Sequence, residues 1–262
     1  MRRAALILTS VLVLLMTAQG ESAGITNGTA DNGDHPYVGV ASFFTVDGTQ
    51  SHRCSASLLS PRLVLTAGHC TVGMKTARVF FDELADLDGT AYYQGAPFTY
   101  PGFCEGNCGP GRLNFPGDVG VIVLNPPVPA SAVGTYASLP TAGVVDLLPN
   151  KAPIDLVGYG VSRQVQQPGG QIWVGPITRK FAPTELVSGQ FRQSDVQLRL
   201  ALNPGGGSGG ACFGDSGGPD LQGGSNVVLA VNSWVNNSNC AGVGTGARID
   251  KPAILAWING PH

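Results

Sequence analysis

The sequence predicts an all-β protein of the barrel or sandwich type. Glycine and proline are abundant (38 and 19 of 262 residues), only 12% of the residues are charged, and the apolar segments are short and separated by turn residues. This combination is typical of many short strands joined by tight turns. The expected strands are Tyr37–Thr45, Leu63–Thr66, Val119–Leu124, Ile154–Tyr159, Val196–Leu202 and Val227–Trp234.

One short helix is expected near the C-terminal end, over Lys251–Ile258. Pro252 falls in its first turn and Gly260 lies beyond its end, which is the usual placement of these two residues at helix ends. No earlier stretch repeats its apolar residues with a helical period over a length sufficient for a helix. The predicted fold class is therefore all-β.

Residues 1–24 have the pattern of a signal peptide. Arg2 and Arg3 precede an apolar stretch, Ala4–Met16, and small residues follow. The apolar stretch is short for a transmembrane helix, and the alternative is a buried N-terminal helix. Cleavage after Gly20 would leave a four-residue pro-segment, 21–24, whereas cleavage after Gly24 would expose residue 25 directly. The sequence therefore predicts a secreted, extracellular protein.

The charge of the mature chain argues against two classes of partner. Without the two signal arginines and Glu21 it has 13 basic and 16 acidic side chains, a net charge of −3. It contains no basic run of the kind that binds nucleic acid or an anionic membrane surface. We expect no nucleic-acid partner, no membrane partner after signal cleavage, and a monomer.

Six cysteines in an exported chain predict three disulfides, although spacing alone allows 15 pairings. A metal-site interpretation of Cys104 and Cys108 lacks two further ligands nearby. We therefore predict no metal and no cofactor.

The segment with the most chemical information is Cys212–Pro219, in which Ser216 lies among glycines and follows Asp215. Glycines allow positive φ angles and the close approach of a substrate. Such a loop can turn successive N–H groups toward one point, as an oxyanion requires. The alternative is a flexible linker, which the glycine-rich stretch 203–210 just upstream resembles.

Two further motifs precede this segment. His69 lies in Leu65–Cys70 next to a cysteine, whereas His35, His52 and His262 have no such context. Asp118 leads directly into an apolar strand, 49 residues after His69 and 98 residues before Ser216. An aspartate before a strand is common in turns, so this motif is weak by itself.

Together these motifs resemble those of the trypsin/chymotrypsin-like serine proteases (peptidase S1), over residues 25 to about 259. Gly-Asp-Ser-Gly-Gly-Pro at 214–219 matches the nucleophile motif, and the histidine motif departs from Thr-Ala-Ala-His-Cys at Gly68 alone. The resemblance implies two packed six-stranded antiparallel β-barrels with a short C-terminal helix. The two subdomains would span about 25–135 and 136–250, with the catalytic cleft between them.

The resemblance also implies catalytic roles. Ser216 would be the nucleophile, His69 the general base and then acid, and Asp118 the group that orients and stabilises the imidazole. The backbone N–H groups of Gly214 and Ser216 would form the oxyanion hole. The amine of Ile25 would form an ion pair with buried Asp215 after maturation.

The same resemblance implies a substrate-binding strand and a specificity pocket. Ser233 and Trp234 would pair with the peptide as an added strand. The S1 pocket, which holds the P1 side chain before the cleaved bond, would be built from Gly210, Ala211, Val235 and Gly244. Because this set has no carboxylate and Val235 narrows the entrance, we expect an uncharged pocket for a small to medium apolar P1 residue.

The implied disulfides are Cys54–Cys70 and Cys212–Cys240, which leaves Cys104–Cys108 as the third pair. The expected function is a secreted serine endopeptidase, a hydrolase that cleaves protein or peptide substrates through an acyl-enzyme. Two alternatives come from other classes. A non-catalytic protease homologue would serve as a binding module, and an exported carbohydrate-binding or structural β-protein would leave the ordered motifs unexplained.

Overall fold

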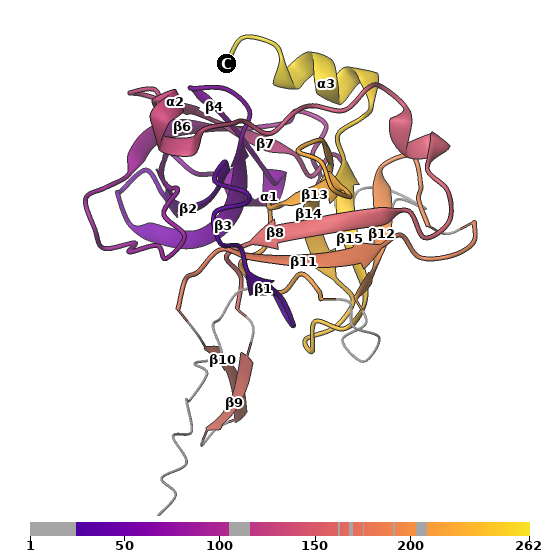
Figure 1. Cartoon of the computed structure of the whole chain (residues 1–262). Coiled ribbons are helices and arrows are strands. Elements are labelled where there is room, and N and C mark those ends of the chain that lie inside the picture. Colours follow the sequence, from indigo (N-terminus) through magenta and orange to yellow (C-terminus); the bar gives the residue numbers. More distant parts are fainter. Residues whose placement is uncertain are drawn as a thin grey trace, which may run out of the picture.

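The computed structural model describes residues 25–104, 116–161, 163–167, 170–174, 176–190, 192–202 and 209–262, and it is built mainly from β-strands (Figure 1). The first half forms a closed barrel in which the strands follow the order β2-β3-β4-β7-β6-β5. These strands are β2 (Val38–Phe44), β3 (Gln50–Leu58), β4 (Leu63–Thr66), β5 (Thr76–Phe80), β6 (Tyr93–Thr99) and β7 (Gly120–Leu124). All the pairings in this barrel are antiparallel.

The second half forms a seven-stranded antiparallel sheet in the order β1-β11-β8-β13-β14-β15-β12. Its strands are β1 (Thr29–Ala30), β8 (Pro153–Gly158), β11 (Lys180–Glu185), β12 (Gln197–Leu202), β13 (Pro219–Gln222), β14 (Val228–Val235) and β15 (Gly242–Arg248).

The second sheet differs in one detail from the sequence-based expectation of two six-stranded barrels. It has seven strands and does not form a continuous closed barrel. It curls until β11 approaches β12, where the contacts include a bridge between Leu186 and Leu200 and a backbone hydrogen bond from Val187 N–H to Arg199 O at 3.0 Å. Thr184 Oγ1 also donates to Ala201 O at 2.6 Å. Pro183 lies in β11 and lacks an N–H, which suits an edge rather than a fully paired strand. The all-β, chymotrypsin-like fold class is confirmed.

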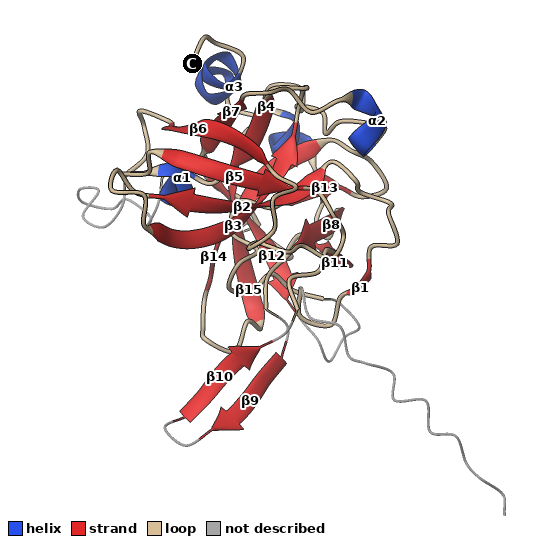
Figure 2. Ribbon diagram, turned by 90° about the vertical axis from the view of Figure 1, so that its left-hand side faces the viewer, coloured by secondary structure: helices blue, strands red, loops and turns tan. Residues whose placement is uncertain are grey.

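The remaining elements are short. They are α1 (Gly68–Thr71), α2 (Ala130–Val133), the 3₁₀ helix η1 (Val144–Leu147), α3 (Pro252–Ile258) and a hairpin of β9 (Arg163–Gln167) and β10 (Gly170–Val174) that projects away from the two sheets (Figures 1 and 2). The predicted C-terminal helix is α3, and Lys251 is its N-cap. Among the described helices, none is both long and apolar enough to cross a bilayer.

The buried apolar side chains form two core clusters. The first fills the closed barrel with side chains such as Phe43 and Ile122, includes Ile258 of α3, and extends onto the second sheet through residues such as Val157 and Leu221. The second core lies inside the curled sheet and includes Leu156, Leu200 and the first described residue, Ile25. Burial of these side chains is the main term that stabilises both units.

A buried ion pair connects the segment before β11 to the first barrel. Nε of Arg179 donates to Asp31 Oδ2 at 2.7 Å, and Nη1 donates to the carbonyl oxygens of Val38 and Phe81 at 3.1 and 2.9 Å. Asp31 also pairs with His35 Nδ1 at 2.6 Å. Although burial would raise the pKa of Asp31, hydrogen bonds from His35 and Arg179 lower it overall. These contacts fix how the two units meet.

The interior of the second sheet contains a polar side chain that the sequence analysis did not identify, Asp220. It is fully buried, and neither carboxyl oxygen has a hydrogen-bond partner among the described residues. Burial raises the pKa of Asp220 to about 8. Because the folded chain then binds more protons than the unfolded chain between about pH 4 and 8, Asp220 lowers the free energy of unfolding as the pH rises through this window.

We therefore expect Asp220→Leu, a change of similar shape, to raise the free energy of unfolding by about 1–3 kcal/mol at pH 8 and by less at pH 5. Urea unfolding at the two pH values measures both quantities. Asp195→Leu, at an acid whose side chain is 99% exposed, is the matched control and should change stability by less than about 0.5 kcal/mol. A lower unfolding midpoint for Asp220→Leu at pH 8 would show that the carboxyl has a partner.

Candidate active site

The first part of the site is a histidine–aspartate pair built by two neighbouring strands of the closed barrel. His69 lies in α1 directly after β4, Asp118 lies two residues before β7, and β4 pairs with β7 through Thr66 and Gly120. Nδ1 of His69 lies 2.8 Å from Oδ2 of Asp118, and the backbone N–H of His69 donates to Oδ1 at 2.7 Å. The carboxylate therefore holds both the ring and the backbone of the histidine.

Asp118 is fully buried, whereas the His69 side chain is 24% exposed. A third residue completes the carboxylate's partners, since Ser233 Oγ donates to Oδ2 of Asp118 at 2.5 Å. Ser233 belongs to β14 of the second sheet, so this hydrogen bond connects the two units at the site. Charge-assisted bonds of this kind hold the ring in one tautomer, with Nδ1 protonated and Nε2 facing away from the acid.

The one departure from the histidine motif, Gly68, has a steric reason. A Cβ at this position would lie 3.0 Å from the backbone N of Val119 and 3.1 Å from Cγ of Phe103. Both distances are shorter than ordinary van der Waals contact, so glycine lets α1 pack closely against Phe103 and the start of β7.

The loop that carries Ser216 is fixed to the first barrel on both sides of the serine. The N–H of Ser55 donates to Ser216 O at 2.8 Å, and Ser55 Oγ donates to Gly214 O at 2.9 Å. Gly217 has φ of 76°, and a Cβ there would overlap Oγ1 of Thr66. Glycine is therefore required at 217, and Ser55 is a positioning residue that the sequence pattern did not indicate.

The two predicted oxyanion-hole residues, Gly214 and Ser216, lie on this loop. Gly214 has φ of 94°, a conformation that favours glycine. Within the described part of the chain, neither N–H donates to a protein acceptor, so both are available to a substrate oxygen. An arrangement of this kind can stabilise the negative charge that develops during acyl transfer.

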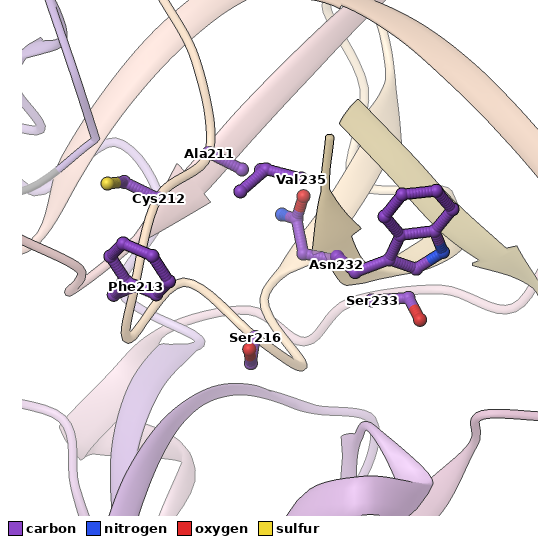
Figure 3. A pocket seen from close by; sticks show the side chains of 8 residues that line it. Ala211, Cys212, Phe213, Ser216, Asn232, Ser233 and Val235 are labelled. Atoms are coloured by element: carbon purple, nitrogen blue, oxygen red, sulfur yellow. The ribbon is translucent and has the colours of Figure 1, made fainter. Parts of the chain in front are cut away.

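A cavity of about 180 Å³ opens beside Ser216 (Figure 3). Of the predicted substrate-binding residues, four line it, and four further residues complete the wall. The lining residues are Ala211, Cys212, Phe213, Ser216, Asn232, Ser233, Trp234 and Val235. Phe213, which is 49% exposed, and Asn232 were not identified from the sequence.

The other two predicted pocket residues, Gly210 and Gly244, do not line this cavity. A Cβ at Gly244 would lie 2.9 Å from Cδ1 of Leu202, and a Cβ at Gly210 would lie 3.1 Å from Cβ of the same leucine. Leu202, which is fully buried in β12, therefore occupies the space next to both glycines. Neither glycine is therefore part of the described cavity lining, to which Ala211 and Asn232 do belong.

Asp215 and Ile25, the residues expected to form the maturation ion pair, are both fully buried. The carboxylate of Asp215 accepts hydrogen bonds from the N–H groups of Gly160 and Cys212 at 2.7 and 2.9 Å. Burial raises the pKa of Asp215 to about 7, although these two bonds and the charges of Arg53 and Lys180 oppose the shift. The carboxyl therefore lies in surroundings that favour an additional cation.

The segment after Ile25 is held near the same loop. Thr26 and Gly210 exchange two backbone hydrogen bonds of 2.9 Å, and Thr26 Oγ1 also donates to Gly210 O. Gly210 precedes Asp215 by five residues, so the start of the described chain lies against the strand that leads into the serine loop.

Two disulfides stabilise the site from either side, Cys54–Cys70 and Cys212–Cys240. These are the two pairs that the sequence resemblance implied. Cys104 is also disulfide-bonded, whereas its expected partner Cys108 lies outside the described residues. The sulfur atoms of Cys54 and Cys70 lie within 4.8 Å of a ring nitrogen of His69, but they are bonded to each other and offer no thiolate to a metal.

Comparison with known proteins identifies the family of the chain. Residues 25–258 match the family model described as Trypsin. Proproteinase E of Bos taurus is 28% identical over 230 residues (81% of this chain and 82% of the relative), and chymotrypsin-like elastase family member 1 of Homo sapiens is 26% identical over 223 residues (81% and 82%). Trypsin of Sarcophaga bullata is 27% identical over 215 residues (79% and 78%).

The fold is also similar to that of a solved structure, HL collagenase, with a TM-score of 0.70 over 89% of this chain and 96% of that chain. At 19% identity this similarity supports the fold alone. The family model, in contrast, covers nearly the whole described chain and includes the histidine, aspartate and serine motifs. The chain therefore belongs to the trypsin family of serine endopeptidases.

Proposed function

We propose that this chain is a catalytically active, secreted serine endopeptidase that uses Ser216, His69 and Asp118 as its triad. The observation that carries the proposal is the buried Asp118 carboxylate, which binds His69 through both Nδ1 and the backbone N–H and is itself held by Ser233. This arrangement fixes the imidazole in the tautomer that a general base requires.

The reaction would proceed in two halves. His69 takes the proton of Ser216 as Oγ attacks the scissile carbonyl, and the N–H groups of Gly214 and Ser216 stabilise the resulting oxyanion. His69 then gives the proton to the leaving amine, and an acyl-enzyme remains. Water, activated by His69 in the same way, hydrolyses the acyl-enzyme and regenerates Ser216. The non-catalytic alternative predicts the same fold without turnover.

The proposal extends to maturation and location. Residues 1–24 would be removed on export, and the cleft would lie between subdomains of about 25–135 and 136–250. Ile25 would provide the cation for Asp215, because its amine becomes free when residue 24 is cut away. The mature protein would act as a monomer on protein or peptide substrates, without a cofactor.

The S1 pocket would take an uncharged side chain. Ala211 and Val235 form apolar walls, and none of the described residues that line the cavity is charged. A buried, unpaired arginine or lysine would cost more than its apolar contacts return. Among apolar and basic P1 residues, we expect Ala, Val or Leu to be cleaved fastest, with Phe or Tyr next and Arg or Lys slower by about 100-fold or more.

A panel of p-nitroanilide peptides that differ at P1 alone tests both the activity and this preference, with a chain that begins at Ile25. Fastest turnover of an Arg or Lys substrate would contradict the uncharged pocket. Fastest turnover of Phe would keep the pocket uncharged but show that Val235 does not narrow it. The absence of hydrolysis for every peptide would favour the non-catalytic alternative.

A further inference from the structure

The lining of the S1 cavity includes an amide, that of Asn232. Its side chain lies beside that of Val235 and is part of the cavity wall (Figure 3). Asn232 is only 4% exposed, so a substrate side chain that fills the cavity removes its remaining contact with water. This observation differs from the sequence-based expectation of an apolar pocket.

The amide is poorly satisfied by the protein itself. In the described part of the chain, its one side-chain hydrogen bond runs from Nδ2 to Gly218 O at 3.5 Å, which is at the outer limit for such a bond. A buried amide without good partners is unfavourable unless a ligand provides them. A P1 side chain with both a donor and an acceptor at its tip would supply what is missing.

The position of Asn232 is fixed relative to the nucleophile. Its backbone O accepts from Gly217 N at 2.7 Å, and its backbone N–H donates to Gly218 O at 2.8 Å. These two glycines directly follow Ser216, so the amide and the serine belong to one hydrogen-bonded unit. A hydrogen-bonding group that is held rigidly in this way gives orientation as well as affinity.

The space behind the amide is also polar. Gly246 of β15 is the cross-strand partner of Asn232, and a Cβ at Gly246 would overlap Oδ2 of Asp220. The unpartnered carboxyl of Asp220 therefore takes the place of a side chain at 246, directly beside Asn232 on the same face. A poorly satisfied amide and a carboxyl without a partner among the described residues therefore lie side by side, although Asp220 does not line the cavity.

We propose that Asn232 determines specificity in the S1 pocket by selecting a P1 side chain that ends in an amide over an apolar side chain of the same size. The P1 amide would donate to Oδ1 of Asn232 and accept from Nδ2, in place of the long bond to Gly218. An apolar tip would provide no partner for Oδ1 and would leave Nδ2 with only the long bond to Gly218 O. This inference rests on the proposed function, because it assigns a substrate class to the same site.

The test uses two pairs of peptide substrates of nearly equal size, Asn against Leu and Gln against Met at P1, with Ala as the reference. We expect the wild-type chain from Ile25 to favour the amide of at least one pair by about tenfold or more in kcat/KM, since a site built for a hydrogen bond discriminates against the analogue that lacks it. In Asn232→Leu the ratio should fall by about tenfold or reverse, with Ala peptides changed much less.

Asn232→Ala provides a second variant if leucine disturbs folding, and thermal unfolding checks both. Equal or faster turnover of Leu and Met peptides by the wild-type chain would overturn the inference, as would amide-to-apolar ratios that stay unchanged in both variants.

Binding of the same peptides to Ser216→Ala, measured by calorimetry, separates this inference from the proposed catalytic function. Amide-selective binding without hydrolysis by the wild-type chain would overturn the catalytic function alone, whereas hydrolysis without amide selectivity would overturn the role of Asn232 alone.

Discussion

Replacement of Ser216 by alanine is expected to lower kcat by about 10⁶-fold and to leave a residual acceleration of ~10³–10⁴ over water. His69→Ala should have an effect of similar size, because a serine hydroxyl is a poor nucleophile without a base. The double variant should be no worse than either single one, since the two residues act as a unit. Steady-state hydrolysis of the best P1 peptide measures all three.

Two controls belong with this experiment. Ser188→Ala changes an exposed serine, and His262→Ala changes an exposed histidine near the C-terminal end. Both should keep activity within about threefold of the wild-type chain. Unchanged turnover in Ser216→Ala or His69→Ala would remove the corresponding residue from the proposed triad, whereas equal losses in the controls would point to misfolding.

The second large effect is expected at Asp215, which does not line the cavity. If the amine of Ile25 pairs with this buried carboxylate, Asp215→Asn leaves an unpaired ammonium in the second core. Loss of one partner of a buried ion pair costs about 3–5 kcal/mol, which corresponds to a loss of activity of roughly 10²–10⁴-fold. Asp195→Asn, at an exposed acid, should have no such effect.

The proposed ion pair between Ile25 and Asp215 leads to two further expected results. Mass analysis of the active protein should show a chain that begins at Ile25, and a chain that retains residues 21–24 should be inactive. Activity should also decline at alkaline pH, because the pair is lost when the amine gives up its proton. Full activity of a chain that begins at Glu21, or of Asp215→Asn, would contradict this account of maturation.

The sequence predicted six strands of the described chain, because each of them is an apolar run bounded by turn residues; they are β2, β4, β7, β8, β12 and β14, and the other nine strands were not predicted. The expected runs at 63–66 and 119–124 correspond to β4 and β7, within one residue at each end. The edge of the second sheet could not be predicted in the same way. Its closure depends on how β11 meets β12, which is a long-range contact that no local pattern encodes.

The same limit applies to the specificity pocket. Residues such as Ala211 and Val235 were found because they flank recognisable motifs. Asn232 was missed because it lies within a run that has the composition of a buried strand, and the direction of its side chain depends on a register shift between Asn232 and Trp234. Leu202 was missed for a related reason, since its contacts with Gly210 and Gly244 are long-range contacts between β12 and other segments.

The central claim is that Ser216 is an activated nucleophile, and reaction with a fluorophosphonate tests it most directly. Titration of the chain that begins at Ile25, followed by peptide mass analysis, should show one phosphonyl group per chain, attached to Ser216. Labelling should be lost in Ser216→Ala and slowed strongly in His69→Ala. A folded wild-type chain that takes up no label, or that carries it on another residue, would contradict the account.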